Sequence, residues 1–99
     1  MEVTWEVDGT DLHVGVSGKI TTLGAMDLEE KLAGMPEGIT SIIFDFAGLK
    51  YIASSGLRVL YWAYEYTNEK GGRTVVKNVE GVVMKLLQIT GFTDFLVFE

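Results

Sequence analysis

The chain has 99 residues, 47% hydrophobic and 22% charged, which is typical of one globular domain spanning residues 1–99 and argues against disorder. Its 14 acidic residues against 8 basic ones give a net charge of −6, which opposes binding to nucleic acid or anionic lipid, since both need a basic face. The chain has no cysteine, so we expect no disulfide and no thiolate metal site. It has no signal-peptide pattern and no apolar run near the ~18 residues of a membrane span, so we expect no membrane insertion.

The first predicted element is a β-hairpin. Apolar and polar residues alternate over residues 3–7 and again over residues 12–16, with the two-residue period of half-buried strands. The turn residues Asp8-Gly9-Thr10 lie between these runs, and the hairpin is predicted to end at Gly18. The only histidine, His13, falls on the polar side of the second strand. We expect a surface or half-buried strand residue, because one histidine without cysteine cannot assemble a typical zinc site and a catalytic base needs a reactive neighbour.

A helix is predicted next. Apolar residues recur at helical spacing between positions 25 and 35, with charged residues between them. Thr22 is a plausible N-cap, although Thr21 competes for that role. Gly34 and Pro36 are expected to end this helix.

The nearly continuous apolar block at residues 42–46 predicts a strand buried on both faces. Asp45 falls in its C-terminal half, at the edge where α/β sheets build their sites. The same carboxylate could instead accept N–H bonds from the loop that follows. Residues 47–52 are predicted to be that loop.

A long helix is predicted to begin near Ser54 or Ser55, to run toward Lys70 and to stop at Gly71-Gly72. A helix that is apolar on most sides is either deeply buried or shared between the core and a partner. Its apolar residues form two stripes, the first with Leu57, Leu60, Tyr61 and Tyr64 and the second with Val59, Trp62, Ala63 and Tyr66.

The C-terminal third completes a regular alternation of strands and helices. A buried strand is predicted at residues 74–76, a helix at residues 83–90 and a final strand at residues 95–98. The resulting order, β-β-α-β-α-β-α-β, predicts a single α/β domain in which an N-terminal β-hairpin precedes β-α units. Such units form a mostly parallel central sheet with right-handed crossovers and helices packed on it.

The stretch Tyr51–Leu57 is the most informative for function, because two serine hydroxyls stand where a loop turns into a helix. A serine there can simply cap the first turn. A helix N-terminus also carries roughly +0.5 charge and free N–H groups, so it tolerates a phosphoryl group. Such a group adds about −1.5 to −2 charge at one exposed point and can switch an interface without unfolding the domain. No Walker A, G-x-G-x-x-G or G-x-S-x-G pattern occurs, which argues against nucleotide binding or a hydrolase.

The segment Phe44–Leu60, FDFAGLKYIASSGLRVL, resembles the signature of the STAS domain, the module of anti-sigma factor antagonists and of sulfate-transporter tails. Three further pieces fit in the same order. Gly18-Lys19-Ile20-Thr21 corresponds to the family's G-x-[LI]-D segment, Gly71-Gly72 precedes the next strand, and residues 83–92 resemble the last helix with its T/S-G-[LF] ending. The resemblance covers nearly the whole chain.

The resemblance implies a compact right-handed β-α superhelix and a cytoplasmic bacterial anti-sigma factor antagonist, which is not an enzyme and needs no cofactor. In the family's bacterial regulators, an anti-sigma factor serine kinase phosphorylates the first serine of D-S-[ST]-G, the phosphorylated antagonist no longer binds the kinase, and a serine phosphatase resets it. Carried over, the phosphoacceptor is Ser54. The implied partner-binding residues are Thr21, Ala53, Ser55, Gly56, Leu57, Arg58 and Trp62.

Two positions depart from the family pattern. The aspartate of the serine motif is Ala53, and the aspartate of G-x-[LI]-D is Thr21. These changes remove carboxylates that would orient the serine hydroxyl, and they also remove negative charge that would repel a phosphate. The alternative is therefore a non-phosphorylated STAS scaffold that binds proteins in a transporter or signalling complex. An enzyme acting on a small molecule is a third interpretation, and the oligomeric state stays open.

Overall fold

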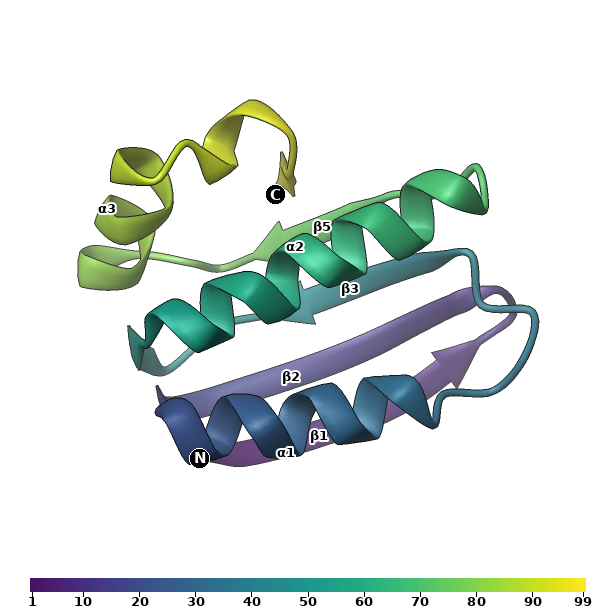
Figure 1. The fold of residues 1–99 in the computed structure, drawn as a ribbon, viewed down its shortest axis with the longest axis horizontal. Coiled ribbons are helices and arrows are strands. Elements are labelled where there is room, and N and C mark those ends of the chain that lie inside the picture. Colours follow the sequence, from purple (N-terminus) through teal and green to yellow (C-terminus); the bar gives the residue numbers. More distant parts are fainter.

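Strands and helices alternate along residues 1–99 in a computed structural model of the chain (Figure 1). The elements are β1 (Glu2–Asp8), β2 (Asp11–Ile20), α1 (Thr22–Ala33), β3 (Ser41–Asp45), β4 (Leu49–Ile52), α2 (Ser54–Glu69), β5 (Thr74–Lys77), α3 (Gly81–Ile89), the 3-10 helix η1 (Phe92–Asp94) and β6 (Val97–Phe98). None of these helices is long and apolar enough to cross a membrane.

One mixed sheet organises the fold. Its strand order is β1-β2-β3-β5-β6, and β4 pairs with the far end of β2. Only the β1/β2 hairpin is antiparallel, and all other pairs are parallel. Gly9 takes φ +62 in the two-residue hairpin loop, where L-residues other than glycine are strained. The predicted α/β class, hairpin and parallel sheet are confirmed.

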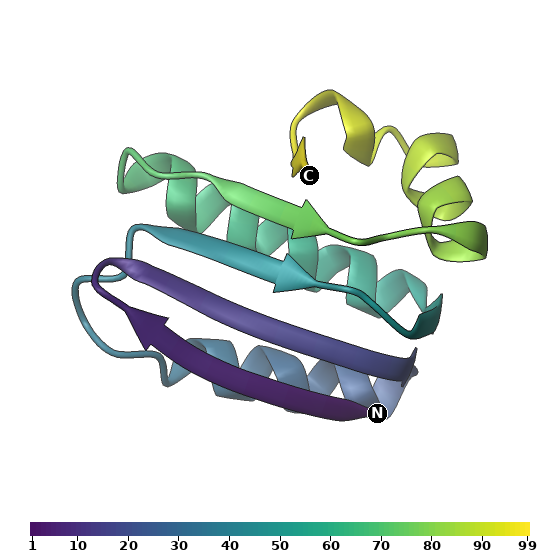
Figure 2. The same cartoon turned by 180° about the vertical axis from the view of Figure 1, so that it is seen from behind.

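Both long helices cover the same face of the sheet. Figure 1 shows α1 and α2 in front of the strands, and Figure 2 shows the strands in front when the molecule is seen from behind. Alternate residues of β2 and β3, such as Val14 and Phe44, are fully buried beneath the helices. Their neighbours Ile43 and Asp45 are only half-buried on the opposite face. The prediction that this strand is buried on both faces was therefore wrong, because no helix covers its second face.

The predicted loop at residues 47–52 was also wrong in part, because Leu49–Ile52 forms β4. Leu49 and Ile52 are buried while the two residues between them are exposed, so the strand lacks the two-residue period that would reveal it. β4 pairs with residues 18–20 of β2, which extend past the predicted end of the hairpin, and a register shift marks the change of partner.

The C-terminal strand is shorter than predicted. Gly91, with φ +82, is the N-cap of η1, and Phe95, where the predicted strand begins, is the residue that follows η1. Phe95 instead packs its ring against Phe92, with ring centroids 5.0 Å apart. Only Val97 and Phe98 remain to pair with β5.

Candidate functional site

The site is built at the start of α2. β4 ends at Ile52, and Ala53 takes the extended N-cap conformation, with φ −76 and ψ 163. Alanine has no side-chain acceptor, so the helix begins without a side-chain cap. The backbone N–H groups of Ser54 and Ser55 donate to no acceptor in the chain, whereas the Gly56 N–H donates to the Ala53 carbonyl oxygen at 2.8 Å. Two free donors therefore mark the positive end of this helix.

The two serine hydroxyls have different surroundings. Ser54 is exposed at the first position of α2. Ser55 is half-buried, and its Oγ lies out of solvent without a hydrogen-bond partner. Only Ser54 presents a hydroxyl that a modifying enzyme can reach. The surroundings of the two hydroxyls thus differ, although both serines stand at the start of the same helix.

Gly56 allows α2 to lie close to the sheet. A Cβ at this position would come within 2.7 Å of Ile52 Cγ1 and 2.9 Å of Ile20 Cγ2. Leu57 follows it and is half-buried against the core. These two motif residues therefore fix the position of the serines.

The N-terminus of α1 lies beside that of α2. Ile20 and Ile52 are register partners in the parallel β2/β4 pair, and the Ala53 N–H donates to the Ile20 carbonyl oxygen at 2.8 Å. Thr21, not Thr22, is the N-cap of α1, because its Oγ1 accepts the Gly24 N–H at 3.1 Å. The two positions that depart from the family pattern are therefore adjacent N-caps. Neither helix carries an acidic residue in its first turn.

A groove of about 390 Å³ runs between α1 and α2. Three of the predicted partner-binding residues line it, namely Ser55, Arg58 and Trp62. The α1 side of the groove was missed by sequence reasoning, which singled out neither Met26 nor Glu29. Their spacing from Thr22, at i+4 and i+7, was the available signal. The groove is lined by Thr22, Ala25, Met26, Glu29, Ser55, Arg58, Val59 and Trp62.

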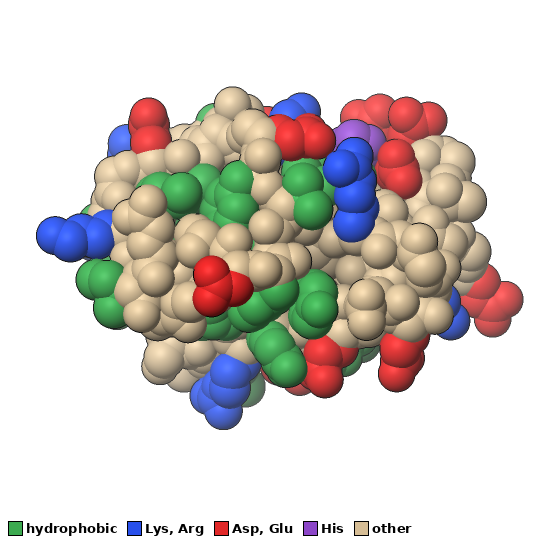
Figure 3. All heavy atoms as spheres, turned by 90° about the horizontal axis from the view of Figure 1, so that it is seen from above, with side chains coloured by type: hydrophobic (Ala, Val, Ile, Leu, Met, Phe, Trp, Pro, Cys, Tyr) green, Lys and Arg blue, Asp and Glu red, His purple; other side chains and the backbone are tan.

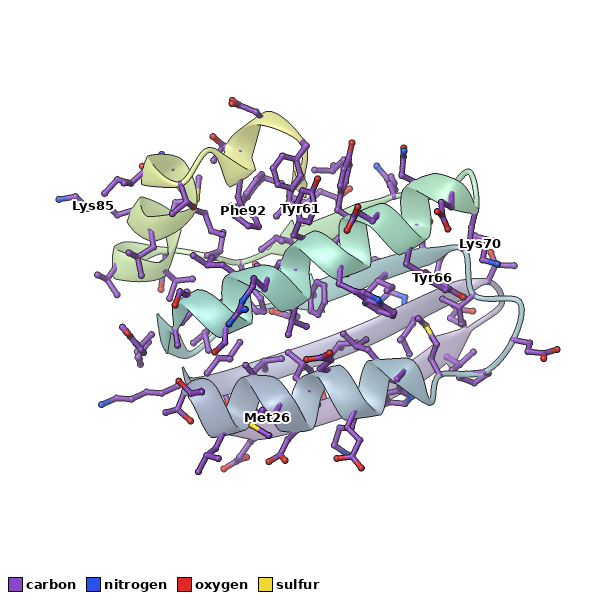
Figure 4. All side chains as sticks on the ribbon, in the orientation of Figure 1. Met26, Tyr61, Tyr66, Lys70, Lys85 and Phe92 are labelled. Atoms are coloured by element: carbon purple, nitrogen blue, oxygen red, sulfur yellow. The ribbon has the colours of Figure 1, made fainter.

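The two apolar stripes of α2 meet different neighbours. Tyr61 and Tyr64 pack on Phe95, with ring centroids 5.6 and 4.7 Å away. Phe92 packs on the same Phe95 ring, and both Tyr61 and Phe92 are labelled in Figure 4. Hydrophobic side chains gather on this side of the molecule in Figure 3. Trp62 belongs to the stripe that faces α1 and stacks on Tyr66 at 5.5 Å. Each stripe thus combines buried and exposed residues.

Asp45 has a structural role outside the groove. Its Oδ1 accepts the Ala47 N–H and the Asn78 Nδ2–H, each at 3.0 Å, and so ties the loop after β3 to the loop after β5. The Asn78 side chain, then the Ala47 N–H and the nearby Lys77 charge, hold the pKa of Asp45 below its usual value, although partial burial opposes them. The interpretation of Asp45 as an acceptor of loop N–H bonds is confirmed.

The free energy of unfolding of Asp45→Asn is expected to fall less than that of the wild type as the pH is lowered. A folded-state pKa below the unfolded value contributes stability that is present above the unfolded pKa and lost as pH falls through the folded pKa. We expect the free energy of unfolding of the wild type to exceed that of the variant by less than about 1 kcal/mol at neutral pH, because solvent screens this carboxylate. At acid pH the two free energies should be equal. Urea unfolding of both proteins across a pH series measures this. A constant difference at all pH values would contradict it.

His13 lies on the uncovered face of the sheet, half-buried in β2 and opposite Glu6 of β1. The prediction of a half-buried strand residue is confirmed. The chain has no group of three or more histidine, cysteine, aspartate or glutamate side chains placed to hold a metal ion.

Comparison with known proteins relates the whole chain to one family. Residues 3–98 match the family model described as Mlab, STAS domain. The chain is 27% identical over 86 residues to the anti-sigma-B factor antagonist of Bacillus subtilis (strain 168), which covers 87% of this chain and 79% of that protein. It is 29% identical over 94 residues to the putative anti-sigma factor antagonist BtrV of Bordetella bronchiseptica (strain ATCC BAA-588 / NCTC 13252 / RB50), covering 93% and 80% of the two chains.

The solved structure of the anti-sigma factor antagonist SpoIIAA in its unphosphorylated form superimposes with a TM-score of 0.87 at 20% identity, covering 99% of this chain and 88% of that one. The Bacillus cell fate determinant SpoIIAA in its phosphorylated form gives a TM-score of 0.79 at 19% identity, covering 99% and 91%. These similarities establish the fold.

Proposed function

The chain belongs to the STAS domain family, and from that premise we propose that it is a cytoplasmic anti-sigma factor antagonist. In this proposal it is a binding protein and not an enzyme. It binds an anti-sigma factor serine kinase when unphosphorylated, phosphorylation of Ser54 releases it, and a serine phosphatase restores it. The proposal is supported by the names of two relatives and by the existence of SpoIIAA in unphosphorylated and phosphorylated forms.

The exposed Ser54 hydroxyl at the uncapped start of α2 carries the proposal. A phosphoryl group on this oxygen lies at the positive end of the helix, near N–H donors that no other acceptor uses. The fold therefore tolerates the added charge. A partner packed over the same point would instead have to bury an anion, which is costly without a counter-charge.

Arg58 is placed to pair with a phosphoryl group on Ser54. It lies four residues after Ser54 on α2, one turn along the same side of the helix, and it is exposed. The only ion pair in the structure joins Arg73 to Glu99, so Arg58 is free to pair. An anion N-terminal to a cation at this spacing is the favourable orientation. Phosphorylated Ser54 would thus draw Arg58 away from a bound partner.

The experiment is phosphorylation by a purified anti-sigma factor serine kinase of the same organism with ATP and magnesium, followed by mass spectrometry. We expect one phosphoryl group on the peptide that contains Ser54. Fragmentation of this peptide should place the phosphate on Ser54. Ser54→Ala should lose it, while Ser17→Ala, on the uncovered face of the sheet, should keep it. An unmodified wild type, or equal modification of Ser54→Ala, would contradict phosphorylation at this residue.

A protein-binding scaffold without phosphorylation, in a transporter or signalling complex, is the second candidate. It is favoured by the neutral residues Thr21 and Ala53 at the adjacent N-caps, where the family pattern has carboxylates that would orient the serine hydroxyl. In that case Ser54 only begins a helix, and partner binding does not depend on charge at this position.

A further inference from the structure

One edge of the sheet is formed by β1, which pairs only with β2. Figure 2 shows β1 as the last strand on its side, with no strand beyond it. Alternate residues of an antiparallel edge strand direct their N–H and C=O groups away from the neighbouring strand. No backbone group of Glu2–Asp8 bonds to a backbone group outside the strand ladder. One side of β1 is therefore an open row of hydrogen-bonding groups.

This edge lacks the features that usually prevent an edge strand from pairing further. β1 has seven residues and stays in register with β2 from Glu2 to Asp8, without a bulge. It contains no proline, lysine or arginine, which commonly protect natural edge strands. At the opposite edge of the sheet, β6 has only two residues. The length and regularity of β1 therefore suit the addition of another strand.

A second groove, of about 560 Å³, runs beside this edge between β1 and α1. It shares no residue with the groove between α1 and α2. Apolar surface is open along this side of β1, since Met1 is 43% and Val7 is 44% exposed. Side chains of an added strand that point toward the helices would enter this edge groove. The edge groove is lined by Met1, Val3, Asp27, Glu30, Lys31 and Gly34.

The other side of β1 carries acidic residues. Glu2, Glu6 and Asp8 point to the uncovered face of the sheet, and all three are exposed. None of them forms an ion pair within the chain. Opposite charges placed directly across a strand pair are stabilising, whereas like charges are destabilising. An added strand should therefore carry basic side chains opposite these acids.

The same acids oppose pairing of this edge with a second copy of the chain. We consider a two-fold antiparallel pair of β1 strands that keeps the helices of both copies on one side of the joined sheet. A pair centred on Thr4 sets Glu2 opposite Glu6, and a pair centred on Trp5 sets Glu2 opposite Asp8. A pair centred on Glu6 sets that residue opposite itself. Each register brings like charges together, so a partner of opposite charge is favoured.

We propose that β1 receives an extended segment of a partner protein in which basic and apolar residues alternate. The segment adds to the sheet as a further strand, and its main chain pairs with the open edge. Its apolar side chains enter the edge groove beside Val3, and its basic side chains stand opposite Glu2 and Glu6. Main-chain pairing supplies affinity, and the alternate side chains supply specificity.

This inference does not depend on the proposed function. The edge groove and the groove between α1 and α2 have separate linings, although both use α1. The chain can therefore hold an added strand at β1 while a second protein contacts the start of α2. It would then act as an adaptor with two binding surfaces.

The first test titrates the wild-type protein with two synthetic peptides, KVKVKVK and KKKKVVV, each as long as β1 and blocked at both ends. They have the same composition and charge, but only the first places all its lysines on one side of a strand. We expect calorimetry to show at least tenfold tighter binding of KVKVKVK. Equal affinities would reflect only attraction to the net charge of −6 and would overturn the inference, as would the absence of binding.

The second test reverses charge at the edge in the double variant Glu2→Lys with Glu6→Lys. This variant should lose at least tenfold affinity for KVKVKVK and should bind the acidic peptide EVEVEVE, which the wild type should not bind. The control variant Glu65→Lys with Glu69→Lys makes the same change in net charge at exposed positions of α2. It should bind both peptides like the wild type. Unchanged affinity in the edge variant, or an equal loss in both variants, overturns the inference.

Amide hydrogen exchange followed by NMR locates the bound KVKVKVK. Amides of alternate residues in β1 should exchange at least tenfold more slowly in the complex, whereas those of β6 should not change. A bound peptide that leaves the β1 amides unprotected overturns the inference. A wild type that sediments as a dimer with these amides already protected also overturns it, because a second copy would then occupy the edge.

Discussion

Ser54→Asp is expected to weaken binding to the anti-sigma partner about 100-fold, or about 2.8 kcal/mol, while leaving the protein at least as stable as the wild type. The carboxylate would stand at the first position of α2, whose N-cap has no side-chain acceptor, so the helix dipole favours it. At an interface the same charge must lose water without a counter-ion. Calorimetric titration with the kinase and urea unfolding measure the two effects separately.

Ser54→Asn is the matched control for this experiment, because it keeps the size and polarity of aspartate without its charge. It should bind within a few-fold of the wild type. If asparagine weakens binding as much as aspartate does, shape and not charge governs the site. If aspartate leaves tight binding unchanged, the scaffold interpretation holds and Ser54 is not a charge switch.

Gly72→Ala is expected to destabilise the fold by about 2–4 kcal/mol. A Cβ at this position would overlap the carbonyl group of Thr40, coming within 2.5 Å of its carbon, and it would also lie 2.7 Å from Ser41 Oγ. The backbone has little room to yield, because the Gly72 N–H donates to the Thr67 carbonyl oxygen at 2.8 Å and the Ile42 N–H donates to the Arg73 carbonyl oxygen at 3.1 Å. Urea unfolding followed by circular dichroism measures the loss.

Gly34→Ala serves as the control for glycine replacement. Gly34 has φ −94, and an added Cβ would meet nothing closer than 3.7 Å. We expect a change within about 0.5 kcal/mol, or slight stabilisation through the unfolded state. Equal losses in the two variants would show that close approach to Thr40 is not what requires glycine at position 72.

Elements whose pattern lies within a short stretch of sequence were predicted correctly, whereas an element defined by a distant partner was not. The hairpin is visible because its pairing partners are separated by two loop residues, and α2 is visible because its apolar period runs for several turns. β4 was missed because its burial does not alternate, and its partner, residues 18–20, lies some thirty residues away in the chain. Local pattern carries no information about such a pairing.

The candidate site shows the same division. Ser54, Arg58 and Trp62 were predicted from one continuous segment and its family resemblance. The half of the groove contributed by α1 depends on how two helices pack, and the isolation of Ser55 Oγ depends on every neighbour around it. The adjacency of Thr21 and Ala53 likewise appears only when β2 and β4 pair. Sequence therefore singled out the candidate serine but not the surface around it.

The placement of α1 and α2 on one side of the sheet has a practical consequence. The strand surface that bears His13 and Glu6 faces away from the serines and the groove (Figure 2). A chip tether or fluorescent label attached there would hold the helices outward and leave them accessible to a second protein. Immobilisation in this orientation would let association kinetics be recorded without steric interference from the support.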